Sequence, residues 1–121
     1  MISMRTPYMH NTWFANVKKF RRGAQSINPL HMSGEDAKSR SLTNCETMWV
    51  FNVFGEIQAK LRIDESLRQG TVSMSHGYGA GRASMRVAES NPGANANRLA
   101  PNSLDAIEPL SNMSWIGAYP V

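Results

Sequence analysis

Cysteine is almost absent from this 121-residue sequence, and its scarcity limits the sites that the chain can form. Cys45 is the only cysteine, so an internal disulfide and a cysteine-only zinc or iron–sulfur site are excluded. A chain with one thiol is expected in a reducing compartment. The polar start Met1–Asn11 lacks the apolar core of a signal peptide. We therefore expect a cytoplasmic location, or a periplasmic one if an export signal lies on a further part of the protein.

Long apolar runs are also missing. No stretch approaches the roughly 18–20 residues that a membrane span requires, so no membrane insertion is expected. Hydrophobic residues make up 41% of the sequence, which is ordinary for a globular protein. The length fits one domain that can bury a modest core without disulfides or metal. We therefore expect residues 1–121 to form a single domain.

Catalytic and metal-binding patterns are lacking as well. The three histidines, His10, His31 and His76, are widely separated and show no H-x-x-x-H spacing. The nine acidic residues lie scattered in contexts typical of helix caps and turns. No G-x-S-x-G motif marks a nucleophilic serine. The residues predict neither a catalytic group nor a metal ligand within this chain.

Positive charge is in excess, with a formal net charge of +4 and an isoelectric point near 9.6. Its densest cluster is Lys18, Lys19, Arg21 and Arg22. Such a cluster is typical of a solvated loop, and it can also attract a phosphate or an acidic partner protein. Nucleic acid is not expected, because the cluster is short and no aromatic stacking platform accompanies it.

The secondary-structure signals are short and mostly of the β type. Thr47–Val53 is rich in the strand-forming residues Trp49, Val50, Phe51 and Val53. Ile57–Ile63 alternates apolar and polar residues after a turn at Phe54-Gly55-Glu56, so the two segments predict a hairpin. Ser33 is a suitable N-cap for a short helix over Gly34–Arg40. The remaining expected elements are an extended segment Asn28–Met32, a strand Thr71–Met74, helical turns at Phe14–Phe20 and Ala83–Glu89, a helix capped by Ser103 from Leu104, and a final strand Ser114–Val121. This pattern favours a compact β-barrel with small helical insertions.

The stretch Gly70–Arg98 is the most distinctive in the chain. A short apolar run ends at His76, three glycines alternate with other residues, and an Asn-x-Asn pair follows Pro92 and Gly93. The stretch fails the G-x-G-x-x-G pattern, because Arg82 stands where a glycine is needed, and it lacks the Gly-Lys-Ser/Thr ending of a P-loop. Glycines at this density allow close backbone approach, either to a ligand or at a tight barrel corner.

Six segments in a fixed order carry a resemblance to a known family. They read T-P-Y-M-H-N-T-W, N-P-L-H-M-S-G-E-D-A, the hairpin, G-T-V-S-M-S-H-G-Y-G, G-A-N-A-N-R-L and L-D-A-I-E-P-L-S. From about Thr6 to Tyr119, the chain resembles the C-terminal molybdopterin-dinucleotide-binding domain of the dimethyl-sulfoxide-reductase family. This family of molybdenum and tungsten oxidoreductases includes formate dehydrogenases and nitrate reductases.

The resemblance implies a fold and a cofactor. The fold is a mainly β domain with short helices, a double-psi β-barrel of about six strands. The cofactor is molybdopterin guanine dinucleotide, in its bis form, with molybdenum or tungsten held outside this domain. The domain would be the non-catalytic end of a larger catalytic subunit, whose remaining domains are its partners. The implied cofactor-binding residues lie on three loops: His10, Asn11, Thr12, Ser75, His76, Gly77, Tyr78, Asn95 and Asn97.

Two other readings stay open on the residues alone. An aspartate-decarboxylase-type barrel enzyme would need a Gly-Ser bond for self-cleavage, and the sequence contains no Gly-Ser dipeptide. A protein-interaction module with a basic face would use the cluster from Lys18 to Arg22 and no cofactor. Salt-sensitive binding to an acidic partner would distinguish this module from a cofactor-binding domain.

Overall fold

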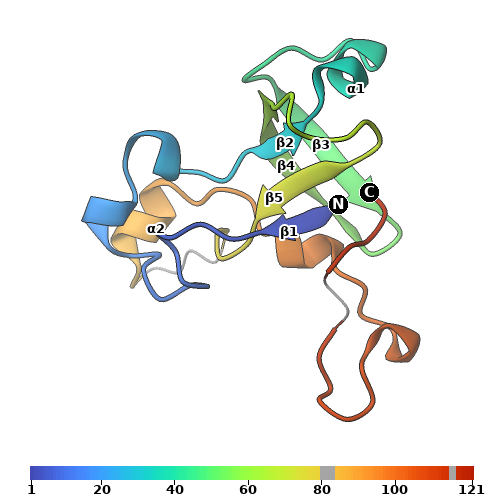
Figure 1. Ribbon diagram of the computed structural model, residues 1–121. Coiled ribbons are helices and arrows are strands. Elements are labelled where there is room, and N and C mark those ends of the chain that lie inside the picture. Colours follow the sequence, from blue (N-terminus) through green and yellow to red (C-terminus); the bar gives the residue numbers. More distant parts are fainter. Residues whose placement is uncertain (80–83, 115–116) are drawn as a thin grey trace.

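A computed structural model describes residues 1–79, 84–114 and 117–121. Its centre is a mixed five-stranded sheet in the order β1-β5-β2-β4-β3 (Figure 1). The strands are β1 (Ile2–Met4), β2 (Leu30–Met32), β3 (Thr47–Asn52), β4 (Gly55–Ile63) and β5 (Val72–Ser75). A mainly β domain is therefore confirmed, with five strands in the described residues where the sequence predicted about six.

The pairing of the strands alternates in direction across the sheet. β1 runs parallel to β5, and β2 runs parallel to β4. Between these pairs β2 and β5 are antiparallel, with Leu30 opposite Met74. The β3–β4 hairpin is antiparallel from the pair Thr47–Lys60 to the pair Asn52–Gly55, as the alternating pattern predicted.

The hairpin turn is tighter than the sequence predicted. Gly55 and Glu56 already belong to β4, so only Val53 and Phe54 connect the strands. The physical reason is Asn52, whose side-chain oxygen accepts hydrogen bonds from the N–H groups of Phe54 (2.9 Å) and Gly55 (3.2 Å). An asparagine side chain that bonds the backbone two residues on stabilises a turn by itself.

The helices are short. In α1 (Gly34–Ser39) the Ser33 hydroxyl accepts the Asp36 N–H at 3.2 Å, so the predicted N-cap is confirmed. Ser103 takes the N-cap position of η4 (Leu104–Ala106) as predicted, but its side chain makes no capping hydrogen bond. The other helical segments are η1 (Lys18–Phe20), η2 (Gly23–Gln25), α2 (Arg86–Ser90) and η3 (Ala96–Leu99). The helical turn predicted at Phe14–Phe20 is shortened to η1. The one predicted at Ala83–Glu89 corresponds to α2, which begins three residues later.

The predicted final strand Ser114–Val121 is reduced to isolated bridges in the residues described. Ser114 bridges Ile107 and Ala118 bridges Ile2, while residues 115–116 lie outside the described ranges. The second bridge places the two chain ends side by side: the Tyr119 N–H donates to the Met1 carbonyl at 3.0 Å.

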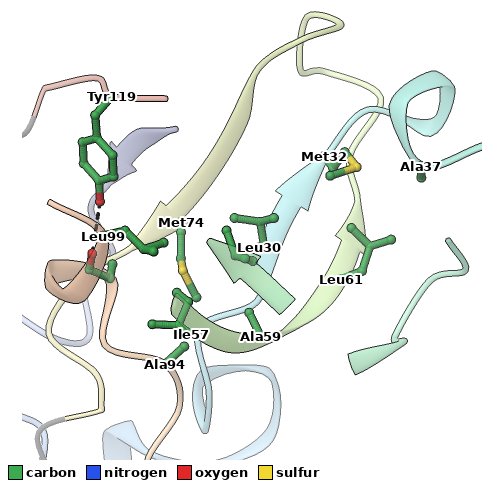
Figure 2. Packing of buried hydrophobic residues seen from close by; sticks show 12 residues of the cluster. Leu30, Met32, Ala37, Ile57, Ala59, Leu61, Met74, Ala94, Leu99 and Tyr119 are labelled. Carbon is green, nitrogen blue, oxygen red and sulfur yellow. Dashed lines mark hydrogen bonds between the residues drawn. The ribbon is translucent and has the colours of Figure 1, made fainter. Parts of the chain in front are cut away.

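The main core lies on one face of the sheet (Figure 2). Leu30, Leu61 and Met74, one residue from each of three neighbouring strands, are almost completely buried there. Leu99 of η3 closes one end of this core, and the Tyr119 hydroxyl donates to the Ala96 carbonyl at 3.1 Å. Burying apolar side chains of this size contributes about 1.5–3 kcal/mol each. η3 is therefore fixed to the sheet on the side where the Asn-x-Asn pair lies.

A second, smaller cluster lies beyond the end of the sheet. It contains Met9, Ala15, Tyr78 and Ala88, with Met85 packed against it. In Figure 1 these segments, with η1, η2 and α2, gather on the side of the molecule away from α1. One member of this cluster, Met9, lines the first pocket of the candidate site.

Candidate functional site

Two glycines hold together the three loops that the sequence singled out. Gly77 (φ +91°) lies so close to the Asn11 carbonyl that an added Cβ would overlap it. Gly79 (φ +73°) lies in the same way against the backbone of Asn95. Only glycine combines this backbone angle with this approach at no steric cost. The loop after β5 therefore sits between the loop at Asn11 and the loop at Asn95.

A first pocket of about 130 Å³ opens on the Asn11 side. His10, Asn11 and His76 line it together with Arg5 and the neighbouring residues Met4, Thr6, Pro7 and Met9. His10 (φ +42°) and Asn11 (φ +61°) both adopt left-handed backbone angles, which are uncommon outside glycine and easiest for Asn, Asp and His. Thr12 is exposed and does not line this pocket.

Both ring nitrogens of His76 have partners inside the protein. Nδ1 lies 3.0 Å from the Ser3 hydroxyl, and Nε2 lies 3.0 Å from the side-chain oxygen of Asn11. A neutral ring satisfies both contacts when Nε2–H donates to Asn11 and Ser3 donates to Nδ1. Partial burial, with a smaller contribution from Arg5, lowers the pKa of His76 below its usual value. His76 is therefore neutral at pH 7 and connects β1 to the Asn11 loop.

A second pocket of about 420 Å³ opens on the Asn95 side. Its polar lining includes Glu56, Gln58, Asn95 and Arg98, and the indole of Trp49 is more than half exposed beside them. The rest of its lining is Ile57, Gly79, Pro92, Gly93 and Ala94.

The Asn-x-Asn pair keeps hydrogen-bonding capacity free. The Asn95 side-chain oxygen accepts the Asn97 N–H at 3.1 Å. Over residues 1–79, 84–114 and 117–121, the Asn95 amide nitrogen and the exposed Asn97 side chain have no hydrogen-bond partner. These two amides can pair with a ligand without breaking a bond of the protein.

Two of the predicted site residues face inward. Ser75 is buried at the end of β5. Tyr78 is buried in the small cluster, and its hydroxyl donates to the Gln25 carbonyl at 3.2 Å. Burial raises the pKa of Tyr78, so the phenol stays protonated. Neither side chain lines either pocket, so Ser75 and Tyr78 support the loops from inside the protein.

Arg21 differs from the rest of the basic cluster in a way that the sequence did not reveal. Lys18, Lys19 and Arg22 are exposed, but Arg21 is only 4% exposed. Its guanidinium lies 4.3 Å from the Tyr78 ring centroid and donates to the Asn91 carbonyl. Burial lowers the pKa of Arg21, although an arginine remains charged in proteins. This residue belongs to the interior of the loop region and not to a solvated face.

Asn28 is the second residue that sequence reasoning did not recognise as part of the site. The sequence indicated Asn28 only as the start of an extended segment, because it precedes Pro29. In the structure its side chain is buried and hydrogen-bonds the backbone of Ser75 and of Ala94. An Asn-Pro pair is the only local signal, and it indicates extended backbone and not these distant partners.

The comparisons with known proteins identify the family. The family model described as "Molydopterin dinucleotide binding domain" matches residues 1–114. The chain belongs to this molybdopterin-dinucleotide-binding family. The match covers all three loops of the candidate site. No curated protein matches the chain.

Solved structures support the fold of this molybdopterin-dinucleotide-binding domain. Eleven chains match, among them acetylene hydratase from Pelobacter acetylenicus, with a TM-score of 0.73 and 16% sequence identity. The match covers 96% of the present chain and 17% of the acetylene hydratase chain. The domain thus spans about a sixth of that protein's length, and the likeness at this identity establishes the fold.

The donor set of the two pockets fits a pterin dinucleotide. The free amide nitrogen of Asn95 can pair with a pterin or purine edge, and Arg5 and Arg98 can bind a pyrophosphate, whereas Asn97 lines neither pocket. Among the residues described, no group of three or more His, Cys, Asp or Glu side chains could hold a metal ion. In the same residues, no helix is long and apolar enough to cross a membrane.

Proposed function

We propose that this domain binds the guanine dinucleotide form of molybdopterin as the non-catalytic C-terminal domain of a molybdenum or tungsten oxidoreductase of the dimethyl-sulfoxide-reductase family. The observation that carries the proposal is the contact of one glycine loop with two others. Gly77 contacts Asn11 beside the first pocket, and Gly79 contacts Asn95 beside the second. A long ligand with several polar groups suits two polar-lined pockets whose loops touch the same segment.

The cofactor, when bound, supplies the redox chemistry through the metal that its dithiolenes hold. The bis form, with two pterin dinucleotides per metal, places that metal in another domain of the parent subunit. The present domain binds and orients the dinucleotide. By itself it performs no redox reaction, and its partners are the remaining domains of the parent. A cytoplasmic location is proposed, or a periplasmic one where the parent carries an export signal.

The nine site residues divide into two groups in this proposal. Those assigned to contact the cofactor are His10, Asn11 and Asn95, which line the pockets, and Thr12, Gly77 and Asn97, which lie on the same loops outside the pocket linings. Ser75, His76 and Tyr78 hold the loops in place, because their polar groups are already paired or buried within the protein. The free amides of Asn95 and Asn97 pair with a pterin or guanine edge, while backbone N–H groups near the glycines bind pyrophosphate oxygens.

The proposed fold is a double-psi β-barrel. Its support is the pattern of two parallel pairs, β1–β5 and β2–β4, joined by the antiparallel contact of β2 with β5. The bridge between Ile2 and Ala118 adds a further segment beside β1. An experimental structure with an open, unclosed sheet would contradict this fold.

Calorimetric titration with purified pterin–guanine dinucleotide, and with GMP as a fragment, tests the function. The wild-type chain should bind, and the double variant Asn95→Ala/Asn97→Ala should bind at least about tenfold more weakly, because each amide contributes a ligand hydrogen bond. Asn44→Ala is the control, since Asn44 is an exposed asparagine whose side-chain oxygen bonds Ile63 and which lines neither pocket. Equal dinucleotide binding by wild type and double variant would refute the site. Salt-sensitive binding to an acidic protein without nucleotide affinity would favour the interaction module.

A further inference from the structure

Asn28 uses its whole side-chain amide inside the protein. The residue is only 2% exposed. Its Nδ2 group donates to the carbonyl oxygens of Ser75 at 2.7 Å and Ala94 at 2.8 Å. Its Oδ1 atom accepts the Ala94 N–H at 2.8 Å. Two donors and one acceptor on a short stem are what these three backbone groups require.

The two residues that Asn28 bonds are the points from which two site loops begin. Ser75 is the last residue of β5 and directly precedes His76. Ala94 directly precedes Asn95. Segments far apart in the sequence are thus fixed to each other through one side chain. The separation of the two loops is set at their starting points.

The backbone around Asn28 is packed too closely to take another arrangement easily. An added Cβ at Gly93 would approach both the Asn28 side-chain oxygen and the Tyr78 ring. Gly79 N–H donates to the Pro92 carbonyl, which connects the same two loops one step further out. When the Asn28 amide is removed, the carbonyls of Ser75 and Ala94 lose the side-chain donor that joins them.

We propose that Asn28 is a positioning residue of the cofactor site, which sets the spacing between the His76 loop and the Asn95 loop. The proposal rests on the proposed function for the meaning of the two loops. Asn28 lines neither the first nor the second pocket, but it lines a smaller pocket of about 190 Å³ that shares Gln58, Gly93 and Ala94 with the second. Its proposed action on the site is through Ser75 and Ala94.

Asp36 offers a matched control at the other end of the sheet. It is a buried polar side chain that fixes distant backbone, since its Oδ2 atom accepts the Gly70 N–H at 2.7 Å and the Ser33 hydroxyl at 3.0 Å. Its partners lie at α1 and at the connection before β5, away from the loops. Asp36→Ala therefore removes a comparable tether without touching the site.

The first test needs no ligand. Amide hydrogen exchange is measured by NMR in the wild type, Asn28→Ala and Asp36→Ala. In Asn28→Ala we expect exchange about tenfold faster at Gly79 and from Ala94 to Asn97, because the buried tether that keeps both loops closed is lost. In Asp36→Ala these amides should keep wild-type protection. Unchanged loop protection in Asn28→Ala, or equal loosening in both variants, would overturn the proposal.

A second variant serves if Asn28→Ala does not fold. Asn28→Asp keeps the shape but places a carboxylate against two carbonyl oxygens, which raises the pKa of the new carboxyl. Once protonated, it can donate to one carbonyl again. The Ala94 and Asn95 amide shifts of this variant should therefore approach wild-type values as the pH falls, after subtraction of the wild-type titration. Shifts that equal those of the wild type at every pH would contradict the positioning role.

The last test uses GMP and the pterin–guanine dinucleotide. Asn28→Ala should bind roughly tenfold or more weakly, because a displaced loop cannot place its groups on the ligand. Asp36→Ala should bind as the wild type does. If the wild type binds the dinucleotide and Asn28→Ala binds it equally well, this inference is overturned and the proposed function is unaffected. Failure of the wild type to bind the dinucleotide would instead refute the function, and the exchange measurement still decides the role of Asn28.

Discussion

The sheet region and the loop region of this domain are held together in different ways. In the sheet, Leu30, Leu61 and Met74 pack against one another from neighbouring strands. In the loop region the apolar cluster is small, and polar side chains connect segments that are distant in sequence. Asn28 bonds the Ala94 backbone, Arg21 bonds the Asn91 carbonyl, and His76 bonds the Asn11 side chain. Apolar packing carries no direction, whereas a hydrogen bond fixes both distance and angle.

This difference suits the two tasks of the domain. The sheet supplies stability, and under the proposed function the loops present amides and backbone groups at defined positions to the dinucleotide. A polar tether specifies such positions at a modest net gain in stability, while its loss leaves buried groups without partners. The contrast predicts that substitutions in the sheet change stability first and substitutions in the loops change the site first.

The largest effect is expected in the sheet. Leu61→Ala should lower the free energy of unfolding by about 2–5 kcal/mol, because Leu61 is almost fully buried and its removal leaves a cavity. Urea denaturation measures the loss. GMP affinity at a temperature where the variant stays folded should be nearly unchanged. A large loss of GMP affinity in the folded variant would contradict the expectation that sheet substitutions change stability without changing the site.

Two glycines with similar backbone angles separate strain from contact. Gly79 (φ +73°) meets Asn95, whereas Gly70 (φ +77°) has open space where a Cβ would stand. Gly70→Ala should cost only the left-handed angle, about 1 kcal/mol. Gly79→Ala should cost a further 1–3 kcal/mol or so from overpacking. It should also change the Asn95 amide shift by NMR. Equal stability losses in the two variants would mean that the close approach at Gly79 has no energetic weight.

The buried arginine tests the polar side of the contrast. Arg21→Met should lower stability by about 1–3 kcal/mol, because the Asn91 carbonyl and the Tyr78 ring lose their cationic partner. Arg22→Met is the control: Arg22 is exposed, and exposed substitutions stay within about 0.5 kcal/mol. Thermal unfolding of both variants gives the comparison. Equal melting temperatures of the two variants would mean that Arg21 contributes no more to stability than the exposed Arg22.

The smallest effect is a pH dependence at His76. Because the folded protein lowers the pKa of this ring, protonation favours the unfolded chain. Stability should be at its full value above the unfolded pKa of about 6.5 and should fall as the pH drops below it. The loss should stay below about 1 kcal/mol, since solvent screens this partly exposed group. Urea titrations of the wild type and His76→Gln from pH 8 downward measure it, and an identical slope in both would exclude His76 as the cause.

Much of the fold could be predicted because its signals are local. Ser33 lies three residues from the N–H that it caps, and the hairpin pattern lies within one stretch. The position of the hairpin turn was predicted wrongly. Glycine at position 55 indicated a turn there, but the Asn52 side chain bonds the N–H groups of Phe54 and Gly55, and the turn lies at Val53 and Phe54. The convergence of the three loops followed only from the family resemblance, and the residues that bind the cofactor stay a prediction.

The tethers could not be predicted, because their partners are remote along the chain. Asn28 bonds residues 47 and 66 positions away, and Arg21 bonds one 70 positions away. Neither an asparagine nor an arginine at these positions indicates from the sequence that its side chain bonds distant backbone. An asparagine before a proline and an arginine in a basic cluster usually face solvent. Only the three-dimensional arrangement shows that both are interior.

The pairing of β1 with β5 has a consequence for how the chain folds. Ile2 pairs with Ser73, and Leu30 pairs with Leu61 and Met74, all far away in the sequence. Among the strands of the described residues, only β3 and β4 are both paired and consecutive. Sheets built from distant partners fold slowly, since loop closure precedes the gain from pairing. We expect the hairpin to form early and β1 to be added last. Stopped-flow refolding should then show that Leu61→Ala slows folding, while Ile2→Ala mainly accelerates unfolding. Residues 76–79, which follow β5 and contact β1 through the His76–Ser3 hydrogen bond, would acquire their final shape only in that last step.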